Sequence, residues 1–327
     1  MCVYREVVKV FEKALVMYIY AETPIHPGSG IALGIVDLPI QRERHTEFPM
    51  IQGSSIKGVL RNFFVDLKVE EKVKINGKNL VDIIFGEENS IGGISVTDAK
   101  ILAFPVRTLK GVFGWITCPL VLDRYKRDLN LAGKECKWEI PKLDGNNKAI
   151  VCDSNASKKY VYIEDLQLEC TYNENIKDIA ETISNALPDD DVYEEIKKKL
   201  KKDLIIVSDE IFRDLVTLTT EVVTRIKIDP ENGTVQKGAL WTEEYLPTDT
   251  IMYSLILIPS RLSNLKIEIQ DEELKRIIES KEETSDKIVE ILKNFLNKQV
   301  LQIGGDETIG KGFVRIKIEG EGNAKKS

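Results

Sequence analysis

The chain has 327 residues, 43% of them hydrophobic and 30% charged, and its formal net charge is −7. This composition is typical of a globular protein with one large domain, and no apolar run reaches the ~18 residues that a membrane-spanning helix needs. The net acidity, taken alone, argues against nucleic-acid binding. Five widely spaced cysteines without a CxxC pair argue against a disulfide framework or a zinc site and favour a reducing cytoplasm.

The first third of the chain predicts a strand, a helix and a second strand. Residues 14–22 are rich in β-forming side chains and predict the first strand. Residues 53–68 place apolar side chains at helical spacing, and Ser54 or Ser55 is positioned to cap this helix. Residues 92–102 follow two turn glycines and predict the second strand.

The middle of the chain is more irregular. The polar stretch from about 129 to 159 predicts an insertion made of long loops. Residues 160–172 alternate in polarity and predict one strand, whereas 189–204 and 208–216 predict helices, the second capped by Ser208. These elements separate the first strands from the rest of the predicted sheet.

A β-hairpin and a buried strand follow. Residues 219–245 hold two β-rich runs around the turn sequence DPENGT, which predicts a hairpin with Gly233 at positive φ. The strongly apolar run 250–259 predicts a strand in the centre of a sheet. Two helices, a strand–glycine turn–strand unit and a disordered tail complete the chain, at 271–280, 285–298, 300–319 and 320–327.

Strands and helices mix without a regular alternation, which predicts an α+β fold. The simplest candidate is a ferredoxin-like βαββαβ core within a single domain spanning residues 1–327. Because such a core needs fewer than half of these residues, sizeable insertions must decorate it.

The segment from residue 26 to residue 61 concentrates unusual residue types. It contains both histidines, His26 and His45, a lone Asp37 among apolar neighbours, and several basic residues. Asp37 has two interpretations: the outward residue of a short extended segment, which spacing alone slightly favours, or a general base or ligand for a loosely bound Mg²⁺. No HExxH or similar spacing predicts a tightly held metal.

Two further segments have a structural and a functional interpretation. The sequence GGDETIGKG contains Gly304, Gly305 and Lys311, and is either a β-turn with a bulge or a phosphate-binding nest. The sequence KGALWTEEYLP places an aromatic and carboxylate group after the hairpin. It forms either an ordinary strand or a surface that stacks on a base.

Taken together, these motifs resemble the RAMP superfamily of CRISPR proteins. The resemblance rests on HPGSG, GIVDLPIQRERHTEFPMIQGSSIKGVLR, TRIKIDPENGTVQKGALWTEEYLP and QIGGDETIGKGFVRI, which stand in the same order as in that family. Within it, the chain is most similar to the repeated backbone subunits of type III-B Cmr effector complexes, the fourth Cmr subunit. The charged stretch from about 123 to 203 contributes little to the resemblance.

The resemblance implies a fold and an activity. It implies a ferredoxin-like, RRM-like palm with large insertions and a protruding hairpin, the thumb, at about 219–245. Copies would stack along a CRISPR RNA (crRNA) into a helical filament with other Cmr subunits and cut complementary single-stranded target RNA at regular intervals. The reaction would use a loosely bound divalent metal, Mg²⁺ or Mn²⁺. Its catalytic residues would be Asp37, also the metal ligand, His26, Glu243 and Tyr245.

The same resemblance, with the local basic charge, implies an RNA-binding set. Its members are Arg42, Arg44, Ser54, Lys57, Arg61, Gly304, Gly305 and Lys311. Two alternatives remain open: a non-catalytic filament subunit that only holds crRNA, and a ribonuclease that processes precursor crRNA. Asp37 in its motif favours the nuclease over the first, and the thumb hairpin disfavours the second. No membrane partner is expected, and the expected location is the cytoplasm.

Overall fold

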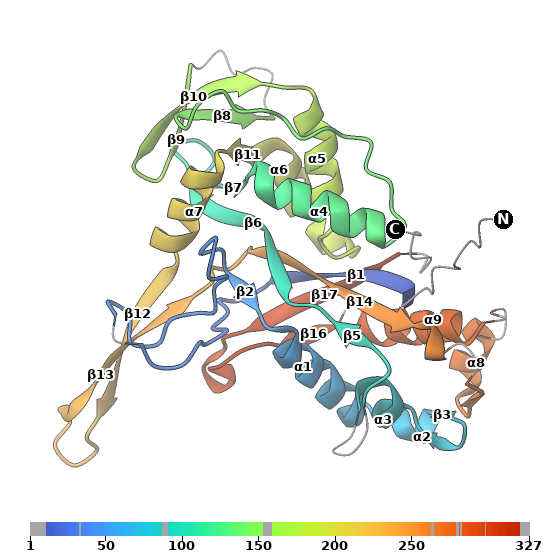
Figure 1. The fold of residues 1–327 in the computed structure, drawn as a ribbon. Helices are drawn as coiled ribbons and strands as arrows, with labels where there is room; N and C mark the ends of the chain where they lie inside the picture. The colour runs from blue at the N-terminus through green and yellow to red at the C-terminus, as the bar shows by residue number, and fades with distance from the viewer. Residues whose placement is uncertain are drawn as a thin grey trace, which may run out of the picture.

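The computed structural model describes residues 11–32, 34–86, 91–152, 159–262, 265–278, 281, 283–297 and 299–320. Its described strands form a sheet of twelve strands, a two-stranded hairpin and a small three-stranded sheet. The predicted mixture of strands and helices is confirmed (Figure 1). None of the described helices is long and apolar enough to cross a membrane.

The centre of the large sheet is formed by β1 (Phe11–Ala21) and β14 (Ile251–Pro259), which pair antiparallel. Antiparallel neighbours flank them: β17 (Phe313–Glu319) beside β1, and β6 (Ala99–Arg107) beside β14. β14 is buried from Ile251 to Ile258, so its predicted central position is confirmed. Shorter strands complete this part: β2 (Met50–Ile51), β5 (Ser95–Val96) and β16 (Val300–Gln302).

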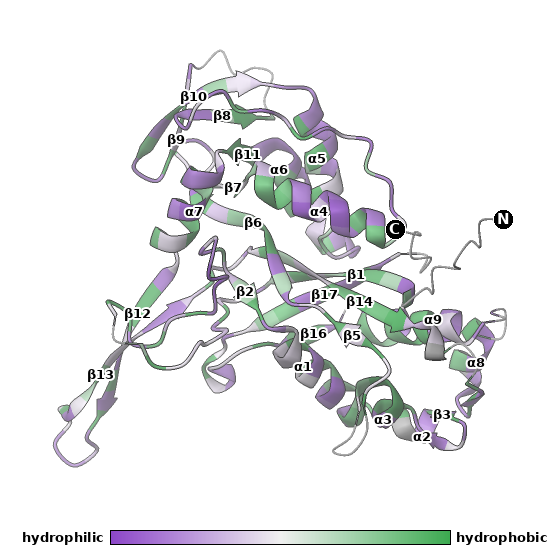
Figure 2. Cartoon of the chain, in the orientation of Figure 1, coloured by the Kyte–Doolittle hydropathy of each residue, from purple (hydrophilic) through white to green (hydrophobic). Residues whose placement is uncertain are grey.

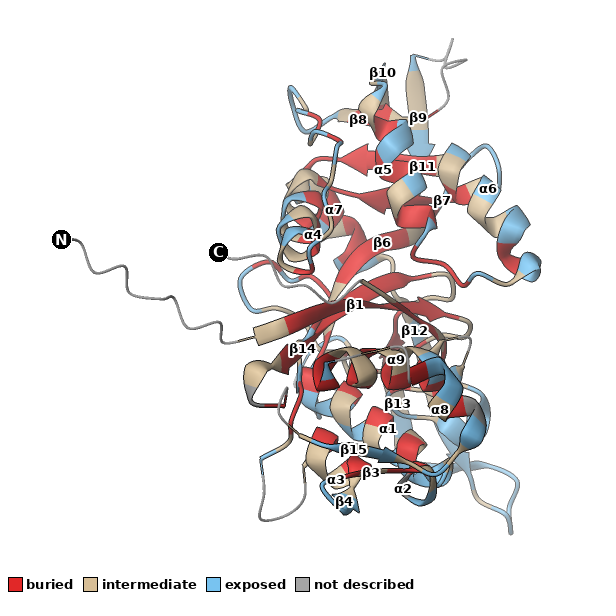
Figure 3. Ribbon diagram, turned by 90° about the vertical axis from the view of Figure 1, so that its right-hand side faces the viewer, coloured by how far each residue is buried: buried red, intermediate tan, exposed pale blue. Residues whose placement is uncertain are grey.

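Two long helices cover one face of these strands (Figures 1 and 3). They are α1 (Gly53–Asp66) and α9 (Thr284–Leu296), and the ring centroids of Phe64 and Phe295 lie 5.5 Å apart between them. Each such buried side chain contributes about 1.5–3 kcal/mol. Small elements lie beside these helices: α2 (Val69–Lys72), β3 (Val73–Ile75), β4 (Lys78–Asn79), α3 (Leu80–Phe85), β15 (Ile267–Ile269) and α8 (Glu272–Ile278).

The predicted cap of α1 is wrong. The N-cap residue is Gln52, which makes no side-chain capping bond, and Ser54 is exposed. Instead the first amide of the helix, Gly53 N, donates to Asp98 Oδ1 at 2.7 Å. A carboxylate from another segment therefore satisfies the helix start and complements its dipole.

The segment between β6 and the hairpin, residues 108–218, is called the insertion from here on. It is more ordered than the loops predicted at 129–159. Its strands continue the large sheet beyond β6 in the order β7, β11, β8, β10, β9. They are β7 (Phe113–Thr117), β8 (Lys148–Val151), β9 (Tyr160–Ile163), β10 (Leu166–Tyr172) and β11 (Leu204–Val207). Its helices are α4 (Pro119–Leu131), α5 (Asn175–Ser184), α6 (Glu194–Asp203) and α7 (Asp209–Leu218).

Two sequence predictions for this insertion need correction, and one of its helices was not predicted. The region 129–159 was expected to be loops, yet it includes the end of α4 and strand β8; residues 153–158 lie outside the described residues. Residues 160–172 form two strands, because Glu164 at φ 49° turns the chain between them. Helix α5 was not predicted. The cap of α7 is confirmed, since Ser208 Oγ accepts from Ile211 N at 3.2 Å.

The predicted hairpin is confirmed as β12 (Glu221–Ile228) and β13 (Val235–Tyr245), which project from the rest of the molecule (Figure 1). Gly233 has φ 65° in the connecting turn, as the sequence predicts. Figure 2 shows hydrophobic and hydrophilic residues side by side on this hairpin, unlike the mostly hydrophobic central strands. The predicted strand–turn–strand near the C-terminus is also confirmed as β16 and β17; residues 321–327 of the predicted tail lie outside the described residues.

Candidate active site

The edge of β13 that does not pair with β12 holds the segment around Asp37. Leu38 N donates to Thr242 O, and Glu244 N donates to Leu38 O, both at 3.0 Å. Leu38 thereby forms a parallel bridge with Glu243. The apolar neighbours of Asp37 in the sequence thus reflect a short extended segment that lies along the hairpin.

Asp37 is anchored through one oxygen only. Its Oδ2 accepts from Thr242 N at 2.8 Å and from Thr242 Oγ1 at 2.9 Å. Oδ1 accepts no hydrogen bond from the described residues, and the residue is exposed. The Thr242 amide, and then its hydroxyl, hold the pKa of the Asp37 carboxyl below its ordinary value. Asp37 is therefore an ionised carboxylate with one oxygen open to a ligand at neutral pH.

His26 is anchored two residues further along the same strand. Its Nδ1 lies 2.7 Å from Glu244 O. Because a carbonyl only accepts, Nδ1 carries the proton, which leaves Nε2 with a lone pair in the neutral ring. Nε2 makes no hydrogen bond with the described residues. A β-strand rises about 3.3 Å per residue, so the anchors of Asp37 and His26 are about 7 Å apart. We name Asp37, His26 and Thr242 the edge site.

Glu243 and Tyr245 belong to a different arrangement. Side chains alternate along a strand, so Trp241, Glu243 and Tyr245 share the face of β13 opposite to that of Thr242. Glu243 accepts from Trp241 Nε1 at 2.7 Å, from Arg225 Nε at 2.9 Å and from the Tyr245 hydroxyl. We name Arg225, Trp241, Glu243, Tyr245 and Asp306 the face cluster, because Tyr245 also lies 2.7 Å from Asp306 Oδ2.

Two members of the face cluster, Glu243 and Tyr245, are buried, whereas the other three are partly exposed. Glu243 is 5% exposed and Tyr245 is 0% exposed. Burial raises the pKa of Glu243, but the hydrogen bonds from Tyr245, Trp241 and Arg225 outweigh it and lower this pKa to about 2. Burial and the two neighbouring carboxylates raise the pKa of Tyr245. In this conformation both side chains are buried and engaged with protein partners, and their predicted catalytic role stays a prediction.

The glycine turn near the C-terminus contacts the backbone of His26, a residue of the edge site. Gly305 N donates to His26 O at 3.0 Å. Gly304 has φ +91°, and a Cβ on it would lie 2.3 Å from His26 O. Lys311 Nζ lies 5.0 Å from the ring centroid of Tyr245. The turn therefore packs against the backbone of His26, and the RNA contacts predicted for Gly304, Gly305 and Lys311 remain predictions.

Arg42 has an internal role. Its Nη2 donates to Glu244 Oε1 at 2.5 Å and its Nη1 donates to Val216 O at 3.0 Å, near the end of α7. Glu244 also accepts from Ile40 N at 3.0 Å and from Thr220 Oγ1 at 2.8 Å. Only 14% of the Arg42 side chain and 7% of the Glu244 side chain are exposed. Arg42 thus fixes the loop against β13, and the predicted phosphate contact would require this ion pair to break.

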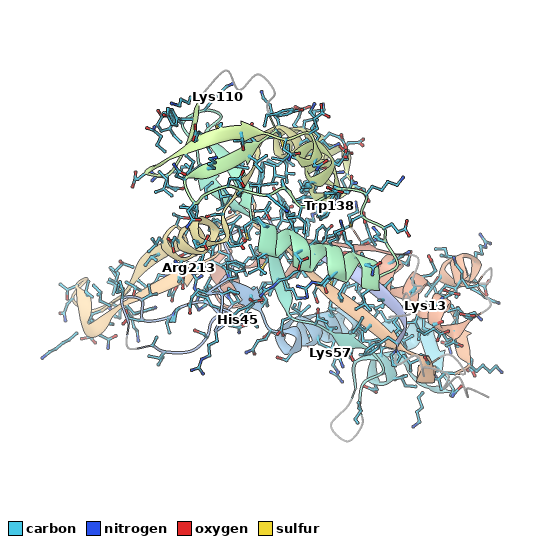
Figure 4. The ribbon with its side chains drawn as sticks, turned by 45° about the horizontal axis from the view of Figure 1, so that its top comes forward. Lys13, His45, Lys57, Lys110, Trp138 and Arg213 are labelled. Atoms are coloured by element: carbon cyan, nitrogen blue, oxygen red, sulfur yellow. The ribbon has the colours of Figure 1, made fainter. Side chains whose placement is uncertain are left out.

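The other predicted RNA-binding residues differ in availability. Arg44 is exposed and makes no hydrogen bond or ion pair with the described residues. Lys57 donates to Ile94 O at 3.0 Å, and Arg61 lies 3.3 Å from Asp82 Oδ1 in a half-exposed pair. Figure 4 shows Lys57 on α1, far from Lys110 on the insertion. Arg44 is the predicted cation that is most available to a phosphate.

His45 lies apart from His26. Its Nε2 is 3.1 Å from Arg124 Nη2, and Arg124 in turn donates to Glu43 Oε2 at 2.7 Å. The two histidines that share one loop therefore belong to different networks, and only His26 joins the edge site.

The side chains of the edge site offer few ligands for a divalent cation. Within the described residues no group of three or more His, Cys, Asp or Glu side chains could enclose a metal ion. Asp37 Oδ1 offers a hard oxygen ligand of the type that Mg²⁺ prefers, and Mg²⁺ commonly keeps several waters and takes substrate phosphates as ligands. The residues therefore fit a weakly held cation whose remaining ligands come from RNA and water.

The sequence did not single out Thr242, Arg225 or Asp306. Thr242 lies between recognisable residues in the sequence LWTEEY, but only the register against Asp37 reveals its contact. Arg225 is placed opposite Trp241 by hairpin pairing. The register of the hairpin shifts between Ile226 and Ile228, so counting outward from the predicted turn at Gly233 would not have found that pair.

Comparisons with known proteins place the chain in a family. The sequence pattern of the RAMP superfamily matches residues 18–315. The CRISPR system Cmr endoribonuclease Cmr4 of Pyrococcus furiosus is 43% identical over 94% of this chain and 96% of its own length. The crystal structure of oligomeric Cmr4 from Pyrococcus furiosus superposes with a TM-score of 0.68 at 37% identity, covering 95% of this chain and 99% of that one.

A more distant structure shares the fold. A chain in the type III-B Cmr-beta complex bound to cognate target RNA has a TM-score of 0.66 at 22% identity, covering 94% of this chain and 98% of its own.

Proposed function

This chain belongs to the RAMP superfamily, and on that premise we propose that it is the repeated backbone subunit of a type III-B Cmr effector complex and its target-RNA endoribonuclease. The observation that carries the proposal is the edge site, where an ionised Asp37 with an open oxygen lies beside a histidine with an open nitrogen. The similar Pyrococcus protein is named a Cmr endoribonuclease.

The proposed palm is ferredoxin-like. The strands β1, β6, β14 and β17 follow one another in the chain and lie in the sheet order β17–β1–β14–β6, with every neighbouring pair antiparallel. Helix α1 follows β1, and α9 precedes β17. This order is that of a βαββαβ unit. The insertion and the thumb both leave the palm between β6 and β14.

The proposed reaction uses the nucleophile that RNA carries. The 2′-oxygen bonds to the adjacent phosphorus while the bond to the 5′-oxygen breaks, which leaves a 2′,3′-cyclic phosphate and a 5′-hydroxyl. Asp37 Oδ1 receives the proton of the 2′-OH, and His26, which for this step must carry a second proton on Nε2, donates that proton to the departing 5′-oxygen. Anchoring both groups to one strand edge fixes their separation before the RNA arrives.

Asp37 also provides the site for a loosely bound divalent cation, Mg²⁺ or Mn²⁺. Oδ1 is the oxygen that would hold the cation, weakly, because no group of three or more acidic, His or Cys side chains among the described residues could enclose it. When bound, the cation would offset the charge that accumulates on the scissile phosphate.

The proposed partners follow from the same assignment. They are crRNA, target single-stranded RNA, further copies of this chain in a helical filament and other Cmr subunits, in the cytoplasm and without a membrane. The similar structures include an oligomeric Cmr4 and a Cmr complex bound to target RNA, which supports this set. Repetition along one RNA lets each subunit bind modestly while the filament binds tightly.

The test is Asp37→Asn in the assembled complex with guide and complementary RNA. We expect cleavage to fall by at least about 100-fold because the proton acceptor is lost, with assembly and target binding retained. A target with a 2′-deoxy sugar at the cut position should resist the wild-type complex. Full activity of Asp37→Asn would refute the assignment of the nuclease site. Cleavage in excess EDTA would show that the reaction needs no divalent cation, and would refute that part of the proposal.

A further inference from the structure

We propose that Thr242 is a positioning residue that holds the Asp37 carboxylate by one oxygen and so presents the other to the RNA. The inference rests on the proposed function of Asp37 and concerns a residue that does not itself contact the substrate.

The geometry around Thr242 is reciprocal. Its hydroxyl accepts from Asp37 N at 3.0 Å and donates to Asp37 Oδ2 at 2.9 Å. Its amide donates to the same Oδ2 at 2.8 Å. One residue therefore fixes both the backbone and the side chain of Asp37. Because both donors converge on Oδ2, the carboxylate plane is set and Oδ1 is directed away from Thr242.

This restraint matters because the surroundings of Asp37 provide little other packing. Asp37 is exposed, and Ile35, two residues earlier, is 101% exposed. An exposed aspartate without fixed donors would sample several rotamers, and a displacement of about 1 Å in an active site can cost about 100-fold in rate. A β-branched threonine suits the task, since its own χ1 is restricted.

Apart from the bond from Asp37 N, the attachment of the loop does not use the hydroxyl. The loop is attached to β13 by the backbone bonds of Leu38 and by the Glu244 carboxylate, which binds Ile40 N at 3.0 Å and Arg42 at 2.5 Å. None of these contacts uses Thr242 Oγ1. Removing the hydroxyl should therefore leave the carboxylate held by the Thr242 amide alone, so that it is less restrained, and leave the rest of the loop in place.

The hairpin offers a matched control. Thr224 pairs directly with Thr242 across the two strands, so their side chains share one face. Thr224 is exposed, and its hydroxyl makes no hydrogen bond with the described residues. The substitution Thr224→Val therefore makes the same chemical change on the same surface without touching Asp37.

The experiment compares Thr242→Val, Thr242→Ser and Thr224→Val in the assembled complex. Single-turnover cleavage and target-RNA affinity are measured for each. We expect Thr242→Val to lower the cleavage rate by about 10- to 100-fold, the usual effect of losing a group that orients a catalytic ligand, at unchanged affinity and thermal midpoint. Thr242→Ser should recover most of the rate, and Thr224→Val should match the wild type.

Each other outcome overturns the inference in a distinguishable way. Wild-type cleavage by Thr242→Val, with Asp37→Asn inactive in the same assay, would refute the role of Thr242 alone. Equal losses in Thr242→Val and Thr224→Val, each matched by weaker target binding, would assign this face to RNA binding instead. Full cleavage by Asp37→Asn would refute the proposed catalytic site and, with it, the reason for positioning Asp37.

Discussion

The edge site and the face cluster use the same strand for opposite purposes. At the edge, Asp37 is exposed and keeps one oxygen open, whereas Glu243 in the face cluster is 5% exposed and accepts from three side chains. Both are carboxylates with lowered pKa values. The two carboxylates carry the same charge but differ in how many lone pairs are unused. A carboxylate with an unused lone pair can react, whereas one whose lone pairs are engaged stabilises the structure.

The largest effect is expected from Glu244→Ala, which removes the anchor of the loop that carries the edge site. It leaves the guanidinium of Arg42 buried without its partner, so the free energy of unfolding should fall by about 3–5 kcal/mol. Urea denaturation of the purified chain measures this change. The control is Glu195→Ala, which breaks an exposed pair with Lys198 and should cost less than about 1 kcal/mol. Equal small losses in both variants would contradict the proposed anchor.

The second-largest effect is expected from Gly304→Ala, which disturbs the contact between the glycine turn and His26. The new Cβ would collide with His26 O while the backbone remains at φ +91°, so we expect a loss of about 2–4 kcal/mol and reduced cleavage. Gly310→Ala is the matched control, because Gly310 has φ +79° but open space around its Cβ. It should cost about 1–2 kcal/mol from backbone strain alone. Similar melting temperatures for the two variants would show that the contact with His26 is not tight.

Glu243→Gln tests whether the face cluster is structural. Losing the charge that binds three donors should cost about 1–3 kcal/mol. Because the folded pKa of about 2 lies below the ordinary 4.5, the contribution of Glu243 is complete above about pH 4.5 and is lost as pH falls toward 2. The stability difference between wild type and variant should therefore narrow from pH 6 to pH 3. Abolished cleavage with unchanged stability would instead support the predicted catalytic role of Glu243.

The smallest effect is expected from Arg44→Gln, on RNA binding alone. The lost phosphate contact should reduce the slope of log affinity against log salt by about 0.7–0.9 while stability stays constant. Lys198→Gln, a change of equal charge on the exposed surface of α6, serves as the control. An unchanged slope for Arg44→Gln would place the guide RNA elsewhere.

Strong local signals made part of the fold predictable. The turn at Gly233, the apolar run of β14 and the helical spacing in α1 and α9 each depend on neighbours in sequence, and each was assigned correctly. Helix α5 was missed although Ile176, Ile179 and Ile183 follow a helical period.

Contacts between distant segments limited the prediction of the site. The motifs of the family identified His26 and Asp37, but nothing local reveals that Asp37 meets Thr242 or that Tyr245 is buried. The cap of α1 failed for the same reason, since Asp98 arrives from another segment. Register and burial depend on contacts within the assembled sheet. They therefore cannot be derived from residues that are neighbours in the sequence.

The pairing of β1 has a consequence for how the chain is made. Tyr18 pairs with Tyr253, roughly 235 positions later, and with Lys317 on its other side. At a synthesis rate of about 5–20 residues per second, this apolar strand waits roughly 10–50 s for its first partner to leave the ribosome. Over that interval an unpaired strand is open to aggregation. The palm therefore closes late, and its yield in a cell depends on whatever shields β1 until β14 and β17 arrive.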